Sequence, residues 1–197
     1  MKRILALLLA LTIGVFSMNV QAETTETLDL ENTIYLDLKD GRVVIQLRPD
    51  IAPNHVARIK ELTRQGFYNG LNFHRVIPGF MAQTGDPNGD GTGGSGQKLK
   101  AEFSNVPHVR GTVSMARAAS PDSGDSQFFI CFDDASYLDG KYTVWGHVIS
   151  GMEAVDKIKA GSQLNNGKVD DPDKIIKMIV AADEGKEAPK VEVPIAD

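Results

Sequence analysis

Cysteine is almost absent from this sequence, which holds one such residue, Cys131, among 197. A lone cysteine cannot close a disulfide within the chain, so the fold must depend on its core rather than on crosslinks. Cys131 lies in the apolar run 128–132, with no His or Lys beside it. We therefore expect a buried and unreactive thiol.

Long apolar segments are also missing once the first 22 residues are set aside. Those residues start with Lys2 and Arg3, continue with the apolar run 4–16 and end in Val-Gln-Ala before Glu23. This layout is typical of a cleaved secretory signal peptide, and the run is too short for the alternative, an uncleaved membrane anchor. We predict a signal peptide at 1–22, no membrane association after cleavage, and export to a bacterial periplasm. The endoplasmic reticulum lumen and secretion are the alternatives.

Positive charge is outnumbered, because 21 Lys and Arg face 26 Asp and Glu; the formal net charge is −5, and loss of Lys2 and Arg3 makes it −7. An acidic chain is not attracted to nucleic acid, so we expect no nucleic-acid partner. Removing 22 of the 197 residues leaves 175, which suits one domain. We predict an N-terminal extension at 23–32, a domain at 33–183 and a polar, mobile tail at 184–197. The sequence has no heptad seam, so we expect a monomer.

Metal and nucleophile motifs are missing as well. No two histidines are spaced as zinc ligands on one element, so we expect no metal site. No serine lies in the G-x-S-x-G pattern of a nucleophile elbow. A Ser-His-Asp set that is assembled only in space stays open. The histidines are His55, His74, His108 and His147.

The glycine-rich stretch 85–96 resembles several ligand-binding loops without completing any of them. Its G-x-G-x-x-G spacing lacks the strand before it and the helix after it, and Gln97 stands where a phosphate-binding loop needs Lys. A D-x-N-x-D-G pattern begins at Asp86, as in calcium loops, but the twelfth position is again Gln97 rather than a carboxylate. We interpret the stretch as a surface loop that needs no cofactor; calcium binding stays an open alternative.

What the sequence does contain is a series of short strand patterns. Apolar residues alternate in 33–38 and 43–47, with Asp40-Gly41 between them as a hairpin signal. Helical spacing begins at Pro53 and ends near Gly66, and a second, shorter helix is indicated from Met152 to Gly161. Many strands with two helices favour a mainly β fold, a closed or nearly closed antiparallel barrel. Further strands are expected at 111–116, 127–132, 142–149 and 174–181.

The segment 73–83 combines groups that a plain core would not need. A permanent cation, Arg75, stands beside apolar residues, and burying it without a partner is costly. In an extended segment Arg75 and Gln83 would point to the same side, although the Pro-Gly turn between them interrupts that count. The alternative, that the aromatic residues here are simply core, leaves Arg75 unexplained.

The sequence of 73–83, Phe-His-Arg-Val-Ile-Pro-Gly-Phe-Met-Ala-Gln, is similar to the signature of cyclophilins. The resemblance spans roughly 33–183, and the chain is similar to bacterial periplasmic cyclophilins. The resemblance implies a closed eight-stranded antiparallel barrel capped by two helices, and peptidyl-prolyl cis-trans isomerase activity in the folding of exported proteins. Further matching segments are 66–68, 91–94, 114–116, 126–130, 138–141 and 144–146.

The resemblance also implies a role for each matching residue. Arg75 is the catalytic residue, donating to the prolyl nitrogen as the amide rotates, and no cofactor takes part. The other implied site residues bind substrate: Phe80, Met81, Phe129 and Leu138 as the proline pocket, Gln83 on the substrate backbone, His74 and Gln127 in support, Ala116, Arg117 and Ala118 along the residues before proline, and Tyr137 and Tyr142 at the rim.

Three positions depart from the best-known members. Tyr137 stands where many eukaryotic relatives have Trp, so we expect only weak cyclosporin binding. Tyr142 replaces a His and Arg117 an Asn. The expected partners are proline-containing peptides and unfolded exported proteins. Two other functions remain as alternatives: a proline-segment binding module or chaperone without turnover, and a carrier that holds a small ligand inside the barrel.

Overall fold

The computed structural model describes residues 28–185. The predicted signal peptide at 1–22 lies outside the described residues, as do residues 23–27 of the extension and 186–197 of the tail, so these assignments stay predictions.

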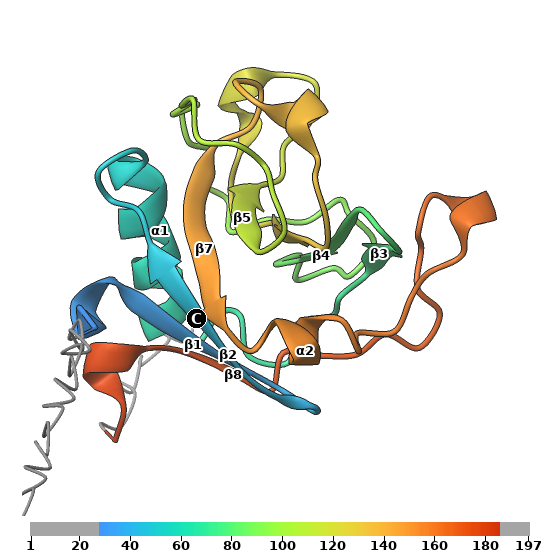
Figure 1. Cartoon of the computed structure of the whole chain (residues 1–197), viewed down its shortest axis with the longest axis horizontal. Helices are drawn as coiled ribbons and strands as arrows, with labels where there is room; N and C mark the ends of the chain where they lie inside the picture. The colour runs from blue at the N-terminus through green and yellow to red at the C-terminus, as the bar shows by residue number, and fades with distance from the viewer. Residues whose placement is uncertain (1–27, 186–197) are drawn as a thin grey trace, which may run out of the picture.

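One antiparallel sheet of eight strands forms the body of the molecule, in the order β3-β4-β6-β5-β7-β2-β1-β8 (Figure 1). The hairpin expected at Asp40-Gly41 joins its first two strands, whose register pairs Leu38 with Gly41. The strands are β1 (Thr33–Leu38), β2 (Gly41–Leu47), β3 (Arg75–Ile77), β4 (Met81–Thr84), β5 (Thr112–Met115), β6 (Phe128–Cys131), β7 (Val144–Ser150) and β8 (Lys177–Val180).

The sheet curls into a half-barrel, so the prediction of a closed barrel is wrong. Within residues 28–185 no ladder joins the edge strands β3 and β8. The chain before β8 meets the β3 region only through isolated bridges, such as Arg75 with Lys168 and Asn72 with Lys174. The two bridges do not join into a ladder, because Asp171 lies between Lys168 and Lys174 with a positive φ angle of 51° and interrupts the extended backbone.

The first helix follows the sequence prediction and the second does not. Helix α1 (Pro53–Arg64) buries Val56, Ile59 and Leu62 and packs against β7 and β8. Helix α2 (Met152–Val155) is a single turn, because the amides of the next residues bond three positions back and tighten the chain. In the described part of the chain, neither helix has the length and apolarity to cross a bilayer. Short 3-10 turns are η1 (Leu30–Asn32), η2 (Pro121–Ser123), η3 (Ser136–Leu138), η4 (Gln163–Asn165) and η5 (Ala181–Asp183).

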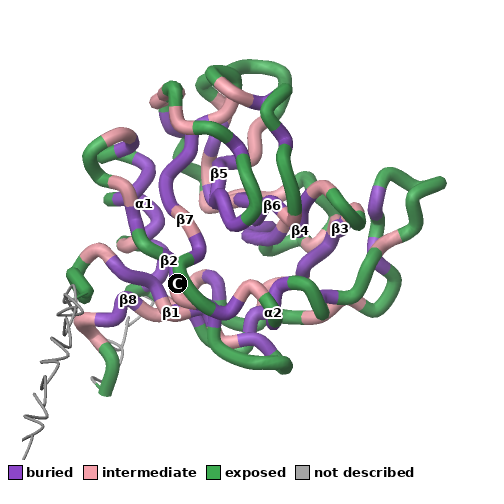
Figure 2. The backbone as a smooth tube through the Cα atoms, viewed as in Figure 1, coloured by how far each residue is buried: buried purple, intermediate pink, exposed green. Residues whose placement is uncertain are grey.

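Strand β6 separates two apolar clusters. Phe128 belongs to the larger cluster beneath α1, where its ring meets Trp145 edge to face at 5.3 Å. Phe129 and Cys131 point the other way, into a smaller cluster with Met81 and Leu138, because successive strand residues face opposite sides. Burial raises the pKa of the Cys131 thiol to about 12, in agreement with the predicted unreactive state. Figure 2 shows the buried stretches gathered along the strands.

Candidate active site

The register of three adjacent strands brings the candidate catalytic residue and two candidate substrate-binding residues into one row. Arg75 on β3 pairs with Gln83 on β4, and Gln83 pairs with Phe129 on β6. The expected proximity of Arg75 and Gln83 is confirmed, because Arg75 Nη1 donates to Gln83 Oε1 at 3.1 Å. A guanidinium, an amide and an aromatic ring therefore lie side by side.

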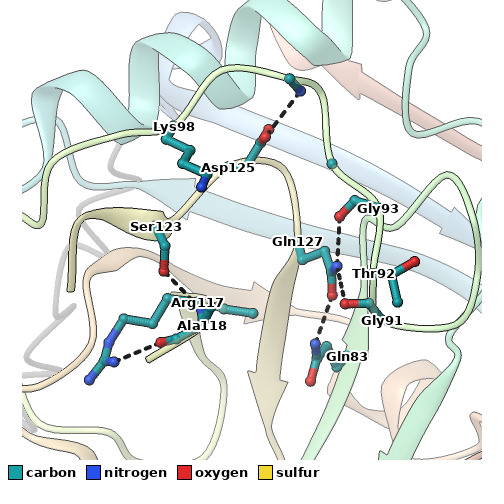
Figure 3. Close-up of a pocket in the computed structure, with 13 residues that line it drawn as sticks. Gln83, Gly91, Thr92, Gly93, Lys98, Arg117, Ala118, Ser123, Asp125 and Gln127 are labelled. Carbon is teal, nitrogen blue, oxygen red and sulfur yellow. Dashed lines mark hydrogen bonds between the residues drawn. The ribbon is translucent and has the colours of Figure 1, made fainter. Parts of the chain in front are cut away.

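A chain of amide groups fixes the orientation of Gln83. Its Nε2 donates to Gln127 Oε1 at 2.9 Å, which leaves Oε1 facing Arg75. The Nε2 of Gln127 donates in turn to the carbonyls of Gly91 and Gly93, at 3.1 and 2.8 Å (Figure 3). The glycine-rich loop thus supports the site through its backbone carbonyls.

Among residues 28–185, the hydrogen-bond partners of Arg75 are all uncharged oxygen atoms. Besides Gln83, it donates from Nε to the carbonyl of Asn166 and from Nη2 to Asn166 Oδ1, both at 3.0 Å. Partial burial lowers the pKa of Arg75 from its ordinary value, yet a guanidinium keeps its proton in proteins. The site therefore contains a fixed cation that water only partly screens.

Asn166 is a site residue that the sequence reasoning missed. The Asn-Gly pair at 166–167 was the available signal, because such pairs are typical of turns with positive φ. That signal predicts a turn but not which side chain the turn will face. The contact with Arg75 joins residues 91 positions apart.

A pocket of about 100 Å³ opens beside the guanidinium. Six of its nine lining residues are aromatic or aliphatic, and Arg75, Gln83 and Arg117 supply the polar groups. Such a pocket suits a small apolar ring with a polar amide attached to it. Its lining contains nine of the thirteen predicted site residues: Arg75, Phe80, Met81, Gln83, Ala116, Arg117, Phe129, Leu138 and Tyr142.

The rim of this pocket is braced by aromatic and cationic contacts. The rings of Phe129 and Tyr142 meet edge to face at 5.8 Å, and the Arg117 guanidinium lies 4.5 Å above the Tyr142 ring. Arg117 also donates to the carbonyl of Lys141, so its side chain links the Tyr142 ring to the backbone of the preceding residue. Tyr137 stacks obliquely on Phe80 at 5.7 Å and is 59% exposed, which leaves much of its ring open to a bound partner.

A larger recess of about 420 Å³ continues from the pocket between Ala116–Ala118 and the glycine-rich loop (Figure 3). It places Ala118 and Gln127, two further predicted residues, at the site. The backbone N–H groups of Ala116 and Ala118 already donate within the protein, to the carbonyl of Gln127 and to Ser123 Oγ. Pairing of this segment with substrate must therefore use its other backbone groups.

His74 directly precedes Arg75 in the chain. It is buried, and loss of hydration lowers its pKa, so the imidazole is neutral at pH 7. It lines a third recess, of about 560 Å³, together with Arg75, Asn166 and Lys168. His74 thus belongs to the surroundings of Arg75 rather than to the lining of the 100 Å³ pocket.

The calcium-like pattern is used within the loop itself. The buried carboxylate of Asp86 accepts backbone N–H groups from Asn88, Asp90 and Gly91 at 2.5 to 3.1 Å. A cation would have to displace these donors, so the geometry gives the calcium alternative no support. Among residues 28–185 there is no group of three or more His, Cys, Asp or Glu side chains that could hold a metal.

A Ser-His-Asp set does assemble in space, but it is buried. His108 lies between Asp139 Oδ1, at 2.9 Å, and Ser114 Oγ, at 3.0 Å. The Ser114 hydroxyl donates to the carbonyl of Thr143, and neither Ser114 nor His108 has exposed surface. A nucleophile must reach its substrate, so this set is structural; the His108 ring stacks on Phe129 and supports the pocket.

Comparison with known proteins agrees with this geometry. Residues 33–180 match the family described as "Cyclophilin type peptidyl-prolyl cis-trans isomerase/CLD". A probable peptidyl-prolyl cis-trans isomerase of Brucella suis is 56% identical over 190 residues, which cover 90% of this chain and 94% of the relative. Peptidyl-prolyl cis-trans isomerase B of Bacillus subtilis is 43% identical over 141 residues, 70% of this chain and 98% of the relative.

Solved structures of similar fold point to the same family. The cyclophilin AquaCyp293 from Hirschia baltica superimposes with a TM-score of 0.70 at 30% identity, over 82% of this chain and 77% of that chain. A Cryptosporidium parvum cyclophilin, crystallised in the presence of the dipeptide Ala-Pro, gives 0.69 at 27% identity, over 75% of this chain and 98% of that chain. The chain belongs to the cyclophilin-type peptidyl-prolyl cis-trans isomerases and has the isomerase activity of that family.

Proposed function

We propose that this isomerase assists the folding of exported proteins, with Arg75 as its catalytic residue and the 100 Å³ pocket as its proline site. The observation that carries the proposal is the position of Arg75. Its guanidinium lines the pocket beside the apolar cluster of Met81, Phe129 and Leu138, and it is held by neutral partners on two sides.

The reaction explains why these groups suffice. Rotation about an X-Pro bond is slow because the planar amide shares the nitrogen lone pair with the carbonyl, which gives a barrier of about 18–20 kcal/mol. No bond is broken, so the enzyme needs only to bind the twisted amide more tightly than the planar forms. Each 1.36 kcal/mol or so of such preference raises the rate about tenfold.

Arg75 supplies that preference. In the twisted amide the lone pair is localised on the prolyl nitrogen, which then accepts a hydrogen bond that the planar nitrogen cannot. A charge-assisted bond from Arg75 is stronger than a neutral one, and partial burial of the guanidinium strengthens it further. Gln83 aligns the guanidinium and is also placed to bind the substrate backbone.

The pocket supplies position. Phe129, Met81 and Leu138 belong to one buried cluster, so the wall that receives the proline ring is fixed by packing. The presence of Ala-Pro with the Cryptosporidium parvum cyclophilin supports a prolyl ligand for this pocket too. We place the residues before proline in the 420 Å³ recess along Ala116–Ala118.

We also propose that the protein acts outside the cytoplasm, most simply in a bacterial periplasm, and as a monomer. The support for export is the signal-peptide layout of residues 1–22, and the support for a monomer is that the sequence has no heptad seam. Mass spectrometry of the protein from a periplasmic fraction should find an N-terminus at Glu23; an intact Met1 would contradict the export proposal. Weak cyclosporin binding remains our expectation, since Tyr137 offers a smaller ring than Trp.

The main alternative is a module that binds proline segments without needing turnover. The test is the refolding of an exported protein whose slow phase is X-Pro isomerisation, with wild type and Arg75→Ala at equal concentration. Catalysis predicts that catalytic amounts of wild type shorten the slow phase and that Arg75→Ala loses at least tenfold of this effect. A binding module would need stoichiometric amounts, and Arg75→Ala would then act as well as wild type.

The interior has little room for the small ligand that the carrier alternative requires. Tyr68, Phe128 and Trp145 are fully buried side by side beneath α1, with ring centroids 5.6 and 5.3 Å apart along the series. Close-packed rings of this kind leave no space for a ligand of comparable size.

A further inference from the structure

A loop formed by residues 161–169, here called the arginine loop, covers the outer edge of β3. Val76 donates to the carbonyl of Gly167 at 2.8 Å and accepts from Gly161 at 2.9 Å, while Val169 donates to the carbonyl of His74 at 3.1 Å. These bonds lie on both sides of Arg75 along the strand. In Figure 1 the loop is the orange segment that projects beside β3. Its backbone is therefore fixed relative to Arg75.

The loop presents Asn166 to Arg75 in an unusual backbone conformation. Asn166 has φ 50°, a region that asparagine tolerates better than most residues. In this conformation both its carbonyl and its side-chain oxygen face one edge of the guanidinium, on Nε and Nη2. Gln83 takes one N–H of Nη1. Of the five N–H groups of the guanidinium, two stay without a described partner, one on each terminal nitrogen.

The partners of Arg75 differ from those of most other arginines in the described part of the chain. Five of the seven arginines there pair with carboxylates: Arg42, Arg48, Arg58, Arg64 and Arg110. Arg75 and Arg117, the two that line the proline pocket, bond only to carbonyl and amide oxygens. A carboxylate partner would compensate the charge of Arg75 and weaken its hydrogen bond to the substrate.

We propose that Asn166 is a positioning residue that orients Arg75 through two neutral oxygens. The guanidinium is then held in place by a partner that does not neutralise its positive charge. This rests on the proposed role of Arg75. It goes further, because it assigns a function to a loop residue that touches neither the proline pocket nor the pocket's aromatic wall. Two requirements follow, an acceptor at position 166 and the absence of negative charge there.

Asn166→Asp separates these two requirements, because it keeps the shape and both acceptors and adds one negative charge. We expect kcat for a short Ala-Pro peptide to fall about tenfold at pH 7, with KM changed less than twofold. Asn166→Gly keeps the positive φ and the carbonyl acceptor but removes Oδ1, and should lower kcat about threefold. Gln163→Glu is the matched control, since it makes the same amide-to-carboxylate change at an exposed position of the same loop that has no bond to Arg75. It should keep kcat within twofold.

The same substitutions in an Arg75→Ala background isolate the mechanism. If Asn166 acts through Arg75, Asn166→Asp should have no further effect there. The inference is overturned if Asn166→Asp keeps wild-type kcat, if it costs the same with and without Arg75, or if Gln163→Glu lowers kcat equally. Loss of the proposed function looks different, because Arg75→Ala alone would then keep full activity. Circular dichroism of each variant confirms folding, and should Asn166→Asp fail to fold, Asn166→Gly decides the question by the same comparison.

Discussion

At the scale of single residues, the candidate site contains a row of polar side chains. Hydrogen bonds between neighbours fix the orientation of each side chain in the row. Gln83 is the central member, since it accepts from Arg75 and donates to Gln127. An amide is needed for both bonds at once, because a carboxylate has no donor and a hydroxyl cannot span both partners.

Gln83→Leu removes both bonds with little change in volume. We expect kcat/KM on an X-Pro peptide to fall about tenfold, because Arg75 loses one of its two holders and a substrate-binding group is lost. The free energy of unfolding should fall by only about 1 kcal/mol, since Gln83 is half-buried. Peptide isomerisation and urea unfolding measure the two quantities.

The control is Gln65→Leu at the end of α1, where the amide bonds only to Glu61 on the surface. It should leave kcat/KM unchanged. If Gln83→Leu behaves like this control, the hydrogen bonds of Gln83 to Arg75 and Gln127 have no role in catalysis.

At the scale of secondary-structure elements, the sequence was informative where the local signals were strong. Helix α1 begins at Pro53 and ends before Gly66, which has φ 70°, as the two residues predict. The hairpin at Asp40-Gly41 was equally well marked. Helix α2 was predicted too long, because the apolar spacing of Val155 and Ile158 is equally satisfied by tighter turns.

Two features could not be read from local patterns. Whether the sheet closes into a barrel depends on how residues 161–175 approach β3. This is a long-range contact that no sequence periodicity encodes. The bond between Asn166 and Arg75 has the same origin. Most of the candidate site was nevertheless predicted, because the resemblance assigned roles residue by residue and nine of the thirteen residues line one pocket.

Substitutions in α1 can test whether this helix contributes to stability without contributing to catalysis. Ile59 is fully buried in the larger cluster, on the opposite side of β6 from the proline pocket. We expect Ile59→Ala to lower the free energy of unfolding by about 3 kcal/mol while kcat/KM at 25 °C stays within twofold of wild type. Urea unfolding and peptide isomerisation provide the two readouts.

Ile176→Ala is the matched control, because Ile176 is 60% exposed just before β8. It should change the free energy of unfolding by no more than about 0.5 kcal/mol. Comparable losses in the two variants would show that α1 contributes little to the core.

At the scale of the whole molecule, stability should depend on pH through histidines that lose hydration on folding, the buried His74 and the partly buried His147. Loss of hydration lowers the pKa of His74 and of His147 in the folded protein. The unfolded chain therefore binds more protons, so the stability contributed by neutral His74 is present above the unfolded pKa of about 6.5 and is lost as pH falls toward the folded pKa.

We expect the free energy of unfolding, measured by urea titration, to decrease from pH 7 to pH 5. His74→Gln should flatten that decrease, whereas Lys168→Gln, a change at an exposed neighbour in the same recess, should not. An unchanged slope in His74→Gln would mean that the imidazole takes up its proton without cost.

The central claim is that the Arg75 guanidinium, which is held by uncharged partners beside the pocket, catalyses rotation about the X-Pro bond. The most direct measurement is exchange between cis and trans forms of a short Ala-Pro peptide by NMR, with wild type, Arg75→Ala and the remote surface control Arg48→Ala. Binding and exchange are observed in the same spectra. We predict that Arg75→Ala still binds the peptide but exchanges it at least tenfold more slowly, while Arg48→Ala matches wild type. Equal exchange by Arg75→Ala and wild type would contradict the account.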